Sequence, residues 1–388
     1  MDGGATPMMP TGLSTNPTGR CDEVGAAGRF GHHATVNFGV YVHVPFCRHR
    51  CDYCAFATWT DRIHLAERYL RACRRQVVEA VAAGLPPVTS VFVGGGTPSL
   101  VPGADLMAVL APLPLADGAE VTVECNPDDV TDDLVAAYRD GGVTRLSFGV
   151  QSMVPSVLRS LGRTHDPDNV RRAVASARRF GLACNLDLIY GAAGETLAQW
   201  ATTVDEAVGL SPDHVSAYAL TVEAGTPLAA DTGRHPDDDD QADKYLLVTD
   251  RLAAAGYRWY EISNWARPGH ECRHNLLYWT QGEYLAIGCA AHGHRDRRRH
   301  WNVRTPERFV EAIEQGRSPE GGAEVLPDDE RRVEGLQLAI RTVDGVAGVD
   351  VDDDVVRMLD GLVDRRGDRV VLTPRGRLLA NEVAIRLG

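Results

Sequence analysis

Two patterns of apolar residues alternate along the chain. Short runs rich in β-branched residues are typical of buried strands, and apolar residues recurring every three to four positions indicate helices that cover a sheet. Asp61 and Thr131 are expected to cap helices, and Gly84, Gly141 and Gly181 follow expected helix ends. The expected strands span 40–44, 90–93, 120–124, 145–148, 183–189 and 214–220, and the expected helices span 61–83, 103–111, 131–140, 167–180 and 196–209.

Six strand–helix units follow one another, which predicts an α/β fold with a parallel sheet and right-handed crossovers. They are too few for a closed eight-stranded barrel. An open, partial barrel and a doubly wound sheet are both compatible with six units. In either fold, ligands bind at the carboxyl ends of the strands, so polar residues at those ends are candidate site residues.

The alternation of expected strands and helices changes after about Leu220. The aspartates at 237–240 are interpreted as a solvated loop before a helix over 241–255. The C-terminal segment reads as two helices, a hairpin turning near 365–369 and a final helix, a winged-helix-like arrangement that we interpret as a structural cap. We therefore expect three parts: a disordered leader (1–35), a partial barrel (36–235) and a smaller α+β domain (236–388).

Composition narrows the class of protein. Apolar residues make up 44% of the chain and charged residues 24%, as in soluble globular proteins. The net charge of −13 argues against nucleic acid as a partner. We expect no transmembrane segment and no secretory signal, and hence a cytoplasmic protein. In that setting, the nine cysteines are expected to be free, metal-bound or catalytic.

Three of these cysteines lie within eight residues, directly after the first expected strand. Cys47, Cys51 and Cys54 have the spacing C-x3-C-x2-C, so one short loop carries all three thiols. A structural zinc ion usually has four ligands, and a fourth at matching spacing is not obvious, although His43 and His49 are near. An iron–sulfur cube held by three thiolates leaves one iron open to a cofactor or substrate. The spacing therefore favours a cluster over zinc.

Polar and small residues recur at the ends of the later strands. The run 94–96 is three glycines, which allow a backbone to approach a ligand closely. Glu124 ends the third expected strand, Gln151 lies just past the fourth and Asp187 lies within the fifth. An unpaired buried carboxylate inside an apolar strand would be costly. Arg163 is a candidate partner for a carboxylate, its alternative being an arginine at an exposed helix end.

These segments resemble the radical S-adenosylmethionine (SAM) family. Within it, they are similar to the branch of oxygen-independent coproporphyrinogen III oxidases and HemW-type haem chaperones. The resemblance implies a partial (β/α)6 barrel, a [4Fe–4S] cluster held by Cys47, Cys51 and Cys54, exchangeable SAM on its open iron, and an electron donor for the cluster. It implies SAM contacts from Tyr41, Tyr53, Gly95, Gly96, Thr97, Glu124, Gln151, Arg163, Asp187 and Ala219.

Two features distinguish the members of this branch. The oxidases carry a further cysteine two residues after the third, where this chain has Phe56, as the chaperones do. The segment from His274 to Trp279 matches the HNxxYW motif that the chaperones use for haem. A neutral imidazole such as that of His274 is a possible haem ligand, and Tyr278 and Trp279 are candidate packing partners for a porphyrin. Taken without the resemblance, the segment also reads as a turn followed by a buried aromatic pair.

We therefore expect a haem chaperone that binds haem and passes it to an acceptor protein, such as a respiratory enzyme. The alternative is an oxygen-independent coproporphyrinogen III oxidase, which acts by radical oxidative decarboxylation. A regulator that uses the winged-helix-like tail is a third possibility. The basic run 295–299 is interpreted as a surface loop, its alternative being a partner for haem propionates.

Overall fold

The computed structural model describes residues 37–387, so the expected disordered leader lies outside the described residues. Six strands form the centre of the fold, and each is parallel to the next. They lie side by side in the order of the sequence, which is the order of a partial barrel rather than that of a doubly wound sheet. They are β1 (Phe38–Val44), β2 (Val88–Gly95), β3 (Leu115–Cys125), β4 (Arg145–Gln151), β5 (Ala183–Tyr190) and β6 (His214–Ala219).

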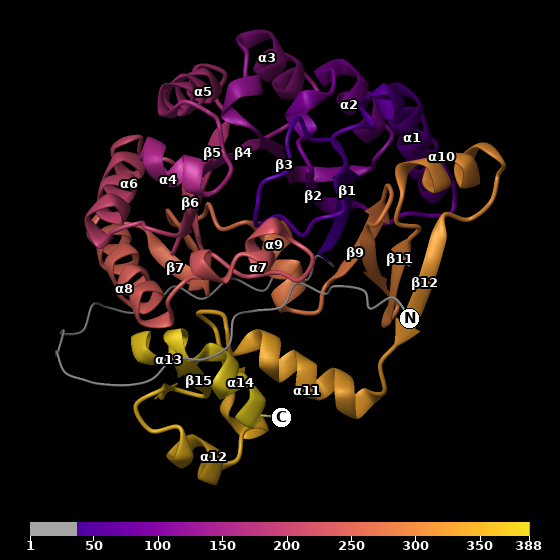
Figure 1. Cartoon of the computed structure of the whole chain (residues 1–388). Helices are drawn as coiled ribbons and strands as arrows, with labels where there is room; N and C mark the ends of the chain where they lie inside the picture. The colour runs from indigo at the N-terminus through magenta and orange to yellow at the C-terminus, as the bar shows by residue number, and fades with distance from the viewer. Residues whose placement is uncertain (1–36, 388) are drawn as a thin grey trace.

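Helices cover the outer face of these strands, as the arc of helices in Figure 1 shows. Thr131 caps α3 as expected, because its side chain accepts the Leu134 amide. The expected cap at Asp61 is wrong: α1 begins five residues later, after a short 3-10 turn over Ile63–Leu65. The helices are α1 (Ala66–Ala82), α2 (Gly103–Leu110), α3 (Asp132–Asp140), α4 (Pro155–Ser160), α5 (Pro167–Arg179) and α6 (Leu197–Gly209).

The sheet continues beyond the six central strands at both of its edges. After α7 (Pro227–Ala230) and α8 (Asp238–Ala254), β8 (Asn264–Ala266) pairs with β6, and β7 (Arg258–Glu261) pairs with β8. At the other edge β9 pairs with β1, and the sheet reaches twelve strands. The expected domain boundary at 235/236 therefore falls between segments of one continuous sheet. The added strands are β9 (Glu283–Ile287), β10 (His292–Arg295), β11 (Arg298–Asn302) and β12 (Glu320–Val325).

The expected acidic loop before α8 is wrong. Asp237 is the N-cap of α8, and its side chain accepts the Asp240 amide. The next three aspartates form the first turn of the helix. Carboxylates are favourable at this position because a helix N-terminus carries partial positive charge and unpaired amides.

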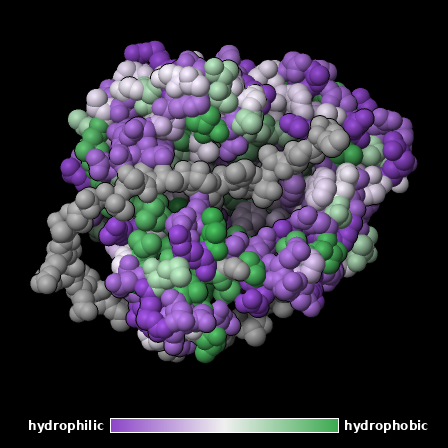
Figure 2. Space-filling model, turned by 60° about the horizontal axis from the view of Figure 1, so that its bottom comes forward, coloured by the Kyte–Doolittle hydropathy of each residue, from purple (hydrophilic) through white to green (hydrophobic). Residues whose placement is uncertain are grey.

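The last part of the chain is a small unit with its own apolar core. Its hairpin of β14 (Val363–Arg366) and β15 (Arg369–Leu372) turns at the place expected for the wing, and Thr373 caps the helix after it. Figure 2 shows the face of the molecule that is turned forward from the bottom of Figure 1, with separate hydrophobic patches among hydrophilic side chains. The remaining elements are α9 (Arg273–Trp279), α10 (Pro306–Glu314), α11 (Asp328–Ala339), β13 (Val346–Ala347), α12 (Asp353–Met358), α13 (Pro374–Leu378) and α14 (Ala380–Leu387).

Among residues 37–387, no helix is both long and apolar enough to cross a membrane. The central strands have apolar residues on one face and many polar ones on the other. On β1, for example, Val40 and Val42 are in the apolar core, whereas Tyr41 and His43 form hydrogen bonds on the opposite face. The inner face of the barrel is therefore the part of the sheet that carries chemistry.

Candidate functional site

A loop over residues 45–59, which we call the cysteine loop, follows β1 at the carboxyl end of the barrel. The Cys47 amide donates to the Trp59 carbonyl at 3.1 Å, and the Trp59 amide donates to the Pro45 carbonyl at 2.8 Å, so the loop is closed at its base. Cys47, Cys51 and Cys54 are partly exposed free thiols on this loop.

The three cysteines supply the type and number of ligands that an iron–sulfur cluster with one open iron requires. Within residues 37–387, no three His, Cys, Asp or Glu side chains meet at one point where they could hold a metal ion. A zinc ion requires its ligands to meet in that way. In an iron–sulfur cube, each thiolate binds a different iron, so the sulfurs can stay further apart. Three free thiols on one loop match that requirement.

Side chains from neighbouring elements hold the cysteine loop in place. The Thr97 hydroxyl lies 3.5 Å from the Cys47 sulfur, and Arg163 Nη1 lies 3.5 Å from the Cys51 sulfur. Arg48 forms an ion pair with the buried carboxylate of Asp129 at 2.9 Å. The loop is thus attached to the segments that follow β2, β3 and α4.

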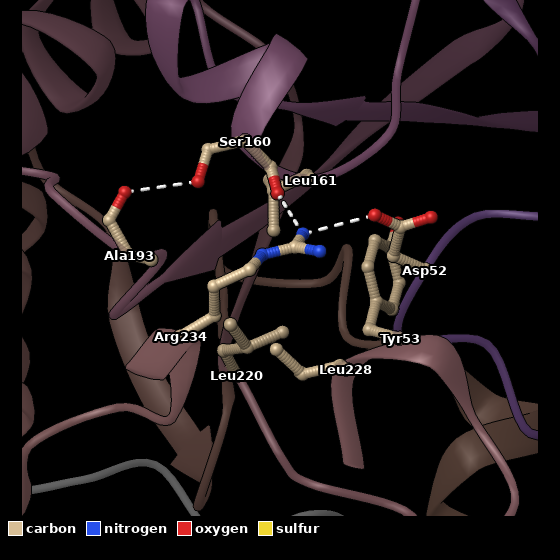
Figure 3. A pocket seen from close by; sticks show the side chains of 8 residues that line it. All are labelled: Asp52, Tyr53, Ser160, Leu161, Ala193, Leu220, Leu228 and Arg234. Atoms are coloured by element: carbon tan, nitrogen blue, oxygen red, sulfur yellow. Dashed lines mark hydrogen bonds and ion pairs between the residues drawn. The ribbon is translucent and has the colours of Figure 1, made fainter. Parts of the chain in front are cut away.

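A further attachment involves Asp52, which lies between two of the cysteines. Arg234 donates to the Asp52 carboxylate at 2.9 Å and to the Ser160 carbonyl at 2.6 Å, as Figure 3 shows. The Leu228 amide donates to the Asp52 carbonyl at 3.0 Å. Tyr53 packs beside this ion pair, in the apolar cluster that includes Leu161. The pairing of Asp52 with Arg234 could not be predicted from the sequence, because no motif relates two residues so far apart in the chain.

The glycine run at the end of β2 lies against the start of the cysteine loop. The Gly96 amide donates to the Val44 carbonyl at 2.8 Å, and the Thr97 amide donates to the Phe46 carbonyl at 2.7 Å. Gly95 has a φ of +106°, and a Cβ atom there would lie 2.3 Å from the His43 ring. Glycine is therefore required at this position both for its backbone conformation and for space.

His43 connects β1 to the cysteine loop. Its Nε2 lies 2.9 Å from the Ala57 carbonyl, and its Nδ1 lies 3.0 Å from the Tyr41 hydroxyl. Since the carbonyl only accepts, Nε2 carries the proton and Nδ1 accepts from Tyr41. Burial lowers the pKa of His43 to about 4 and raises that of Tyr41, so both side chains are neutral.

Two half-buried carboxyl groups lie on the inner face next to the glycine run. Glu124 Oε2 accepts the Gly95 amide at 3.1 Å, and burial together with the charge of Asp187 raises the pKa of Glu124 to about 8. Asp187 accepts hydrogen bonds from Ser147 at 2.7 Å and from Asn185 at 2.8 Å. Burial also raises the pKa of Asp187. Such an acidic pair is suited to a ligand that brings positive charge or hydroxyl donors.

The remaining candidate residues at this end lie on or next to β4 and β6. Gln151 is the last residue of β4 and has a left-handed backbone, with φ of 63°. Arg163 is not at an exposed helix end: its Nη2 donates to the Gly149 carbonyl at 3.0 Å, next to Gln151. Ala219 ends β6, and its register partner on β5 is Tyr190. Most candidates therefore lie at the carboxyl end of the barrel, whereas Tyr41 and Asp187 lie near the middle of β1 and β5.

His274 lies at the opposite end of the barrel. Its ring is fully buried, with Nδ1 3.1 Å from the Ser90 hydroxyl and Nε2 3.0 Å from the Tyr278 hydroxyl. Burial lowers the pKa of His274 to about 3. The amide of His274 lies 3.3 Å from Glu120, which forms a buried ion pair with Arg145 at 3.2 Å. Binding of a metal by either ring nitrogen would first require a hydrogen bond of His274 to break.

The aromatic residues of the same helix differ in exposure. Tyr278 is 37% exposed and forms an edge-to-face pair with Tyr284 at 4.9 Å, whereas Trp279 is buried. The arginines of the nearby basic run all have acidic partners, so their charge is already balanced. The ion pairs are Arg295–Asp296, Arg297–Asp328, Arg298–Glu320 and Arg299–Glu324.

Comparison with known proteins agrees with this architecture. Residues 41–207 match the radical SAM superfamily. The chain is 44% identical to the haem chaperone HemW of Mycobacterium tuberculosis H37Rv, over 89% of this chain and 93% of that protein. It is 35% identical to the haem chaperone HemW of Escherichia coli K12, over 89% and 96% of the two chains.

The structure of E. coli coproporphyrinogen III oxidase (HemN), a radical SAM enzyme, superimposes with a TM-score of 0.79. The match covers 90% of each chain at 22% identity, so it concerns the fold. Together, the sequential parallel barrel, the cysteine loop at its carboxyl end and the identity to HemW proteins over most of the chain lead to one conclusion. This chain belongs to the HemW-type branch of the radical SAM family.

Proposed function

We propose that this protein is a haem chaperone, which binds haem and passes it to an acceptor protein. The observation that carries the proposal is the cysteine loop with Phe56, whose side chain is 66% exposed where the oxidases of the branch have a further cysteine. The identity to proteins named haem chaperones supports the same choice. The acceptor proposed here is a haem-dependent respiratory enzyme, reached in the cytoplasm.

The residues at the carboxyl end divide into two groups. Cys47, Cys51 and Cys54 would hold a [4Fe–4S] cluster, which supplies an open iron for SAM and accepts an electron from a donor protein. The acidic pair Glu124 and Asp187 would bind the polar groups of SAM. The other proposed SAM contacts are Tyr41, Tyr53, Gly95, Gly96, Thr97, Gln151, Arg163 and Ala219.

Haem is proposed to bind at the HNxxYW segment, through His274 or beside it. Because both ring nitrogens of His274 are engaged, ligation by His274 requires its hydrogen bond to Ser90 or to Tyr278 to break. Tyr278, which is partly exposed, is the residue of the motif that haem can reach without breaking a hydrogen bond of His274 to Ser90. This difference makes the two modes of binding distinguishable by mutation.

The test is a haem titration of the anaerobically reconstituted protein, followed by the Soret band. His270→Ala is a matched control for His274→Ala, since His270 precedes α9 and its side chain is partly exposed. We expect wild type and His270→Ala to shift the Soret band and His274→Ala to lose the shift. Transfer is then measured as activation of a haem-free respiratory enzyme. Wild type that gives no Soret shift would contradict the proposal.

The second candidate function is coproporphyrinogen III oxidation, which the fold match to HemN favours. The cluster and SAM sites serve both functions, so they do not separate them. An anaerobic assay with coproporphyrinogen III, SAM and a reductant distinguishes the two functions. Robust formation of vinyl groups would replace the chaperone proposal by the oxidase.

A further inference from the structure

A chain of four hydrogen bonds crosses the barrel interior from α9 to Asp187. Asn275 Nδ2 lies 3.3 Å from the Tyr260 hydroxyl, which lies 2.8 Å from His214 Nε2. His214 Nδ1 lies 2.7 Å from Asn185 Oδ1, and Asn185 Nδ2 lies 2.8 Å from Asp187 Oδ1. The chain therefore joins the second residue of the HNxxYW motif to the Asp187 carboxyl group in the middle of β5.

The hydrogen bonds of this chain all point the same way. The Asn185 amide nitrogen faces Asp187 and the hydroxyls of Ser147 and Ser216, so its oxygen faces His214. His214 must then donate from Nδ1 and accept at Nε2, where the Tyr260 hydroxyl donates. The Tyr260 oxygen in turn accepts from Asn275. Each member thus donates toward Asp187, and each bond polarises the next one.

Burial makes the chain dependent on all its members. The residues Tyr260 and His214 are each 2% exposed and Asn185 is 6% exposed, so water does not readily replace a lost partner. A buried donor or acceptor without a partner is costly, and neighbouring groups rearrange to avoid it. Asn275 is also held by a second bond from the same amide nitrogen, since its Nδ2 donates to the buried Glu261 at 2.9 Å.

We propose that Asn275 is a positioning residue for the SAM site, and that it acts on Asp187 through Tyr260, His214 and Asn185. The inference rests on the proposed function, in which Asp187 contacts SAM. It gives Asn275 a role separate from haem binding. One side of α9 then supports the cofactor end of the barrel, while Tyr278 remains open to a ligand.

The test compares SAM affinity of full-length, reconstituted wild type and Tyr260→Phe by calorimetry. The substitution removes one oxygen from the middle of the chain. We expect the Kd for SAM to rise about fivefold or more, with unchanged iron content. We also expect a weaker SAM-induced change in the electron paramagnetic resonance spectrum of the reduced cluster. Tyr257→Phe is the matched control, because its buried hydroxyl bonds to the Pro212 carbonyl outside the chain.

Asn275→Ala provides a second route if Tyr260→Phe does not fold. It should weaken SAM binding in the same direction, and the double variant should be less impaired than the sum of the two effects predicts. If wild type binds SAM and either Tyr260→Phe or Asn275→Ala binds it with the same affinity, the inference is overturned, but the proposed function is not. Wild type that does not bind SAM would overturn the proposed function, and the inference with it.

Discussion

Glu124 accepts a hydrogen bond from the backbone of Gly95, with its Oε2 atom 3.1 Å from the Gly95 amide nitrogen. The carboxyl group is thereby held at the glycine run, where the carboxyl ends of β2 and β3 meet. Its raised pKa, about 8, means that it is largely protonated at neutral pH until a ligand stabilises its charge.

We expect Glu124 to make stability depend on pH. Its pKa is about 8 in the folded protein and near 4.5 in the unfolded chain, so the folded state binds more protons between these values. Stability should therefore fall as pH rises from about 4.5 to 8, by up to about 5 kcal/mol from this group. Urea unfolding across this range should show a smaller loss in Glu124→Gln than in wild type. An equal loss in the two proteins would contradict the assigned pKa.

Gly95→Ala should disrupt the contact between the glycine run and the cysteine loop. The added Cβ would lie 2.3 Å from the His43 ring, in a backbone with positive φ. We expect a loss of about 3 kcal/mol or more in unfolding free energy, together with poor iron incorporation. Gly84→Ala is the control, since Gly84 also has positive φ but open space around it, and should cost about 1 kcal/mol. Equal costs would exclude the steric explanation.

Arg234→Ala should loosen the cysteine loop, because it removes the ion pair with Asp52 and the hydrogen bond to Ser160. We expect iron loss to a chelator to become roughly tenfold faster, which corresponds to about 1.4 kcal/mol of lost support. Arg251→Ala serves as the control, as Arg251 pairs with Asp205 on the surface away from the loop. Equal rates in Arg234→Ala and wild type would show that this contact does not support the loop.

Lys244→Met should destabilise the fold strongly. The Lys244 ammonium is fully buried, donates to the Glu195 carbonyl at 2.8 Å and lies 3.3 Å from its carboxylate. Without it, a buried acid loses its charged partner, and we expect a cost of about 3–5 kcal/mol in urea unfolding. Adding Glu195→Gln should restore part of this loss. If Lys244→Met alone is as stable as wild type, the Glu195 carboxyl group is neutral in the folded protein.

The central strands could be predicted because their signal is local. Each of β1 to β6 was predicted from a short local run of residues, and each prediction overlaps the observed strand. The strands at the sheet edges were not predicted, since β8 has only three residues and pairs with β6 far away in the sequence. Pairing of that kind depends on tertiary contacts rather than on residue pattern.

The candidate site shows the same division. Residues at the ends of parallel strands meet at one end of a barrel, so the sequence was sufficient to group Glu124 with Asp187. It was not sufficient for His274, because the docking of α9 at the other end depends on Glu120 and Ser90 from distant strands. The sequence was also not sufficient to predict that each arginine of the run 295–299 has a carboxylate partner.

The burial of Lys244 has a practical consequence for experiments in solution. It is the single lysine in the sequence, and its side chain is inaccessible in the folded protein. An amine-directed reagent can therefore modify this side chain only when α8 separates from the segment around Glu195. The rate of labelling at Lys244, followed by mass spectrometry, would report how often this part of the barrel wall opens.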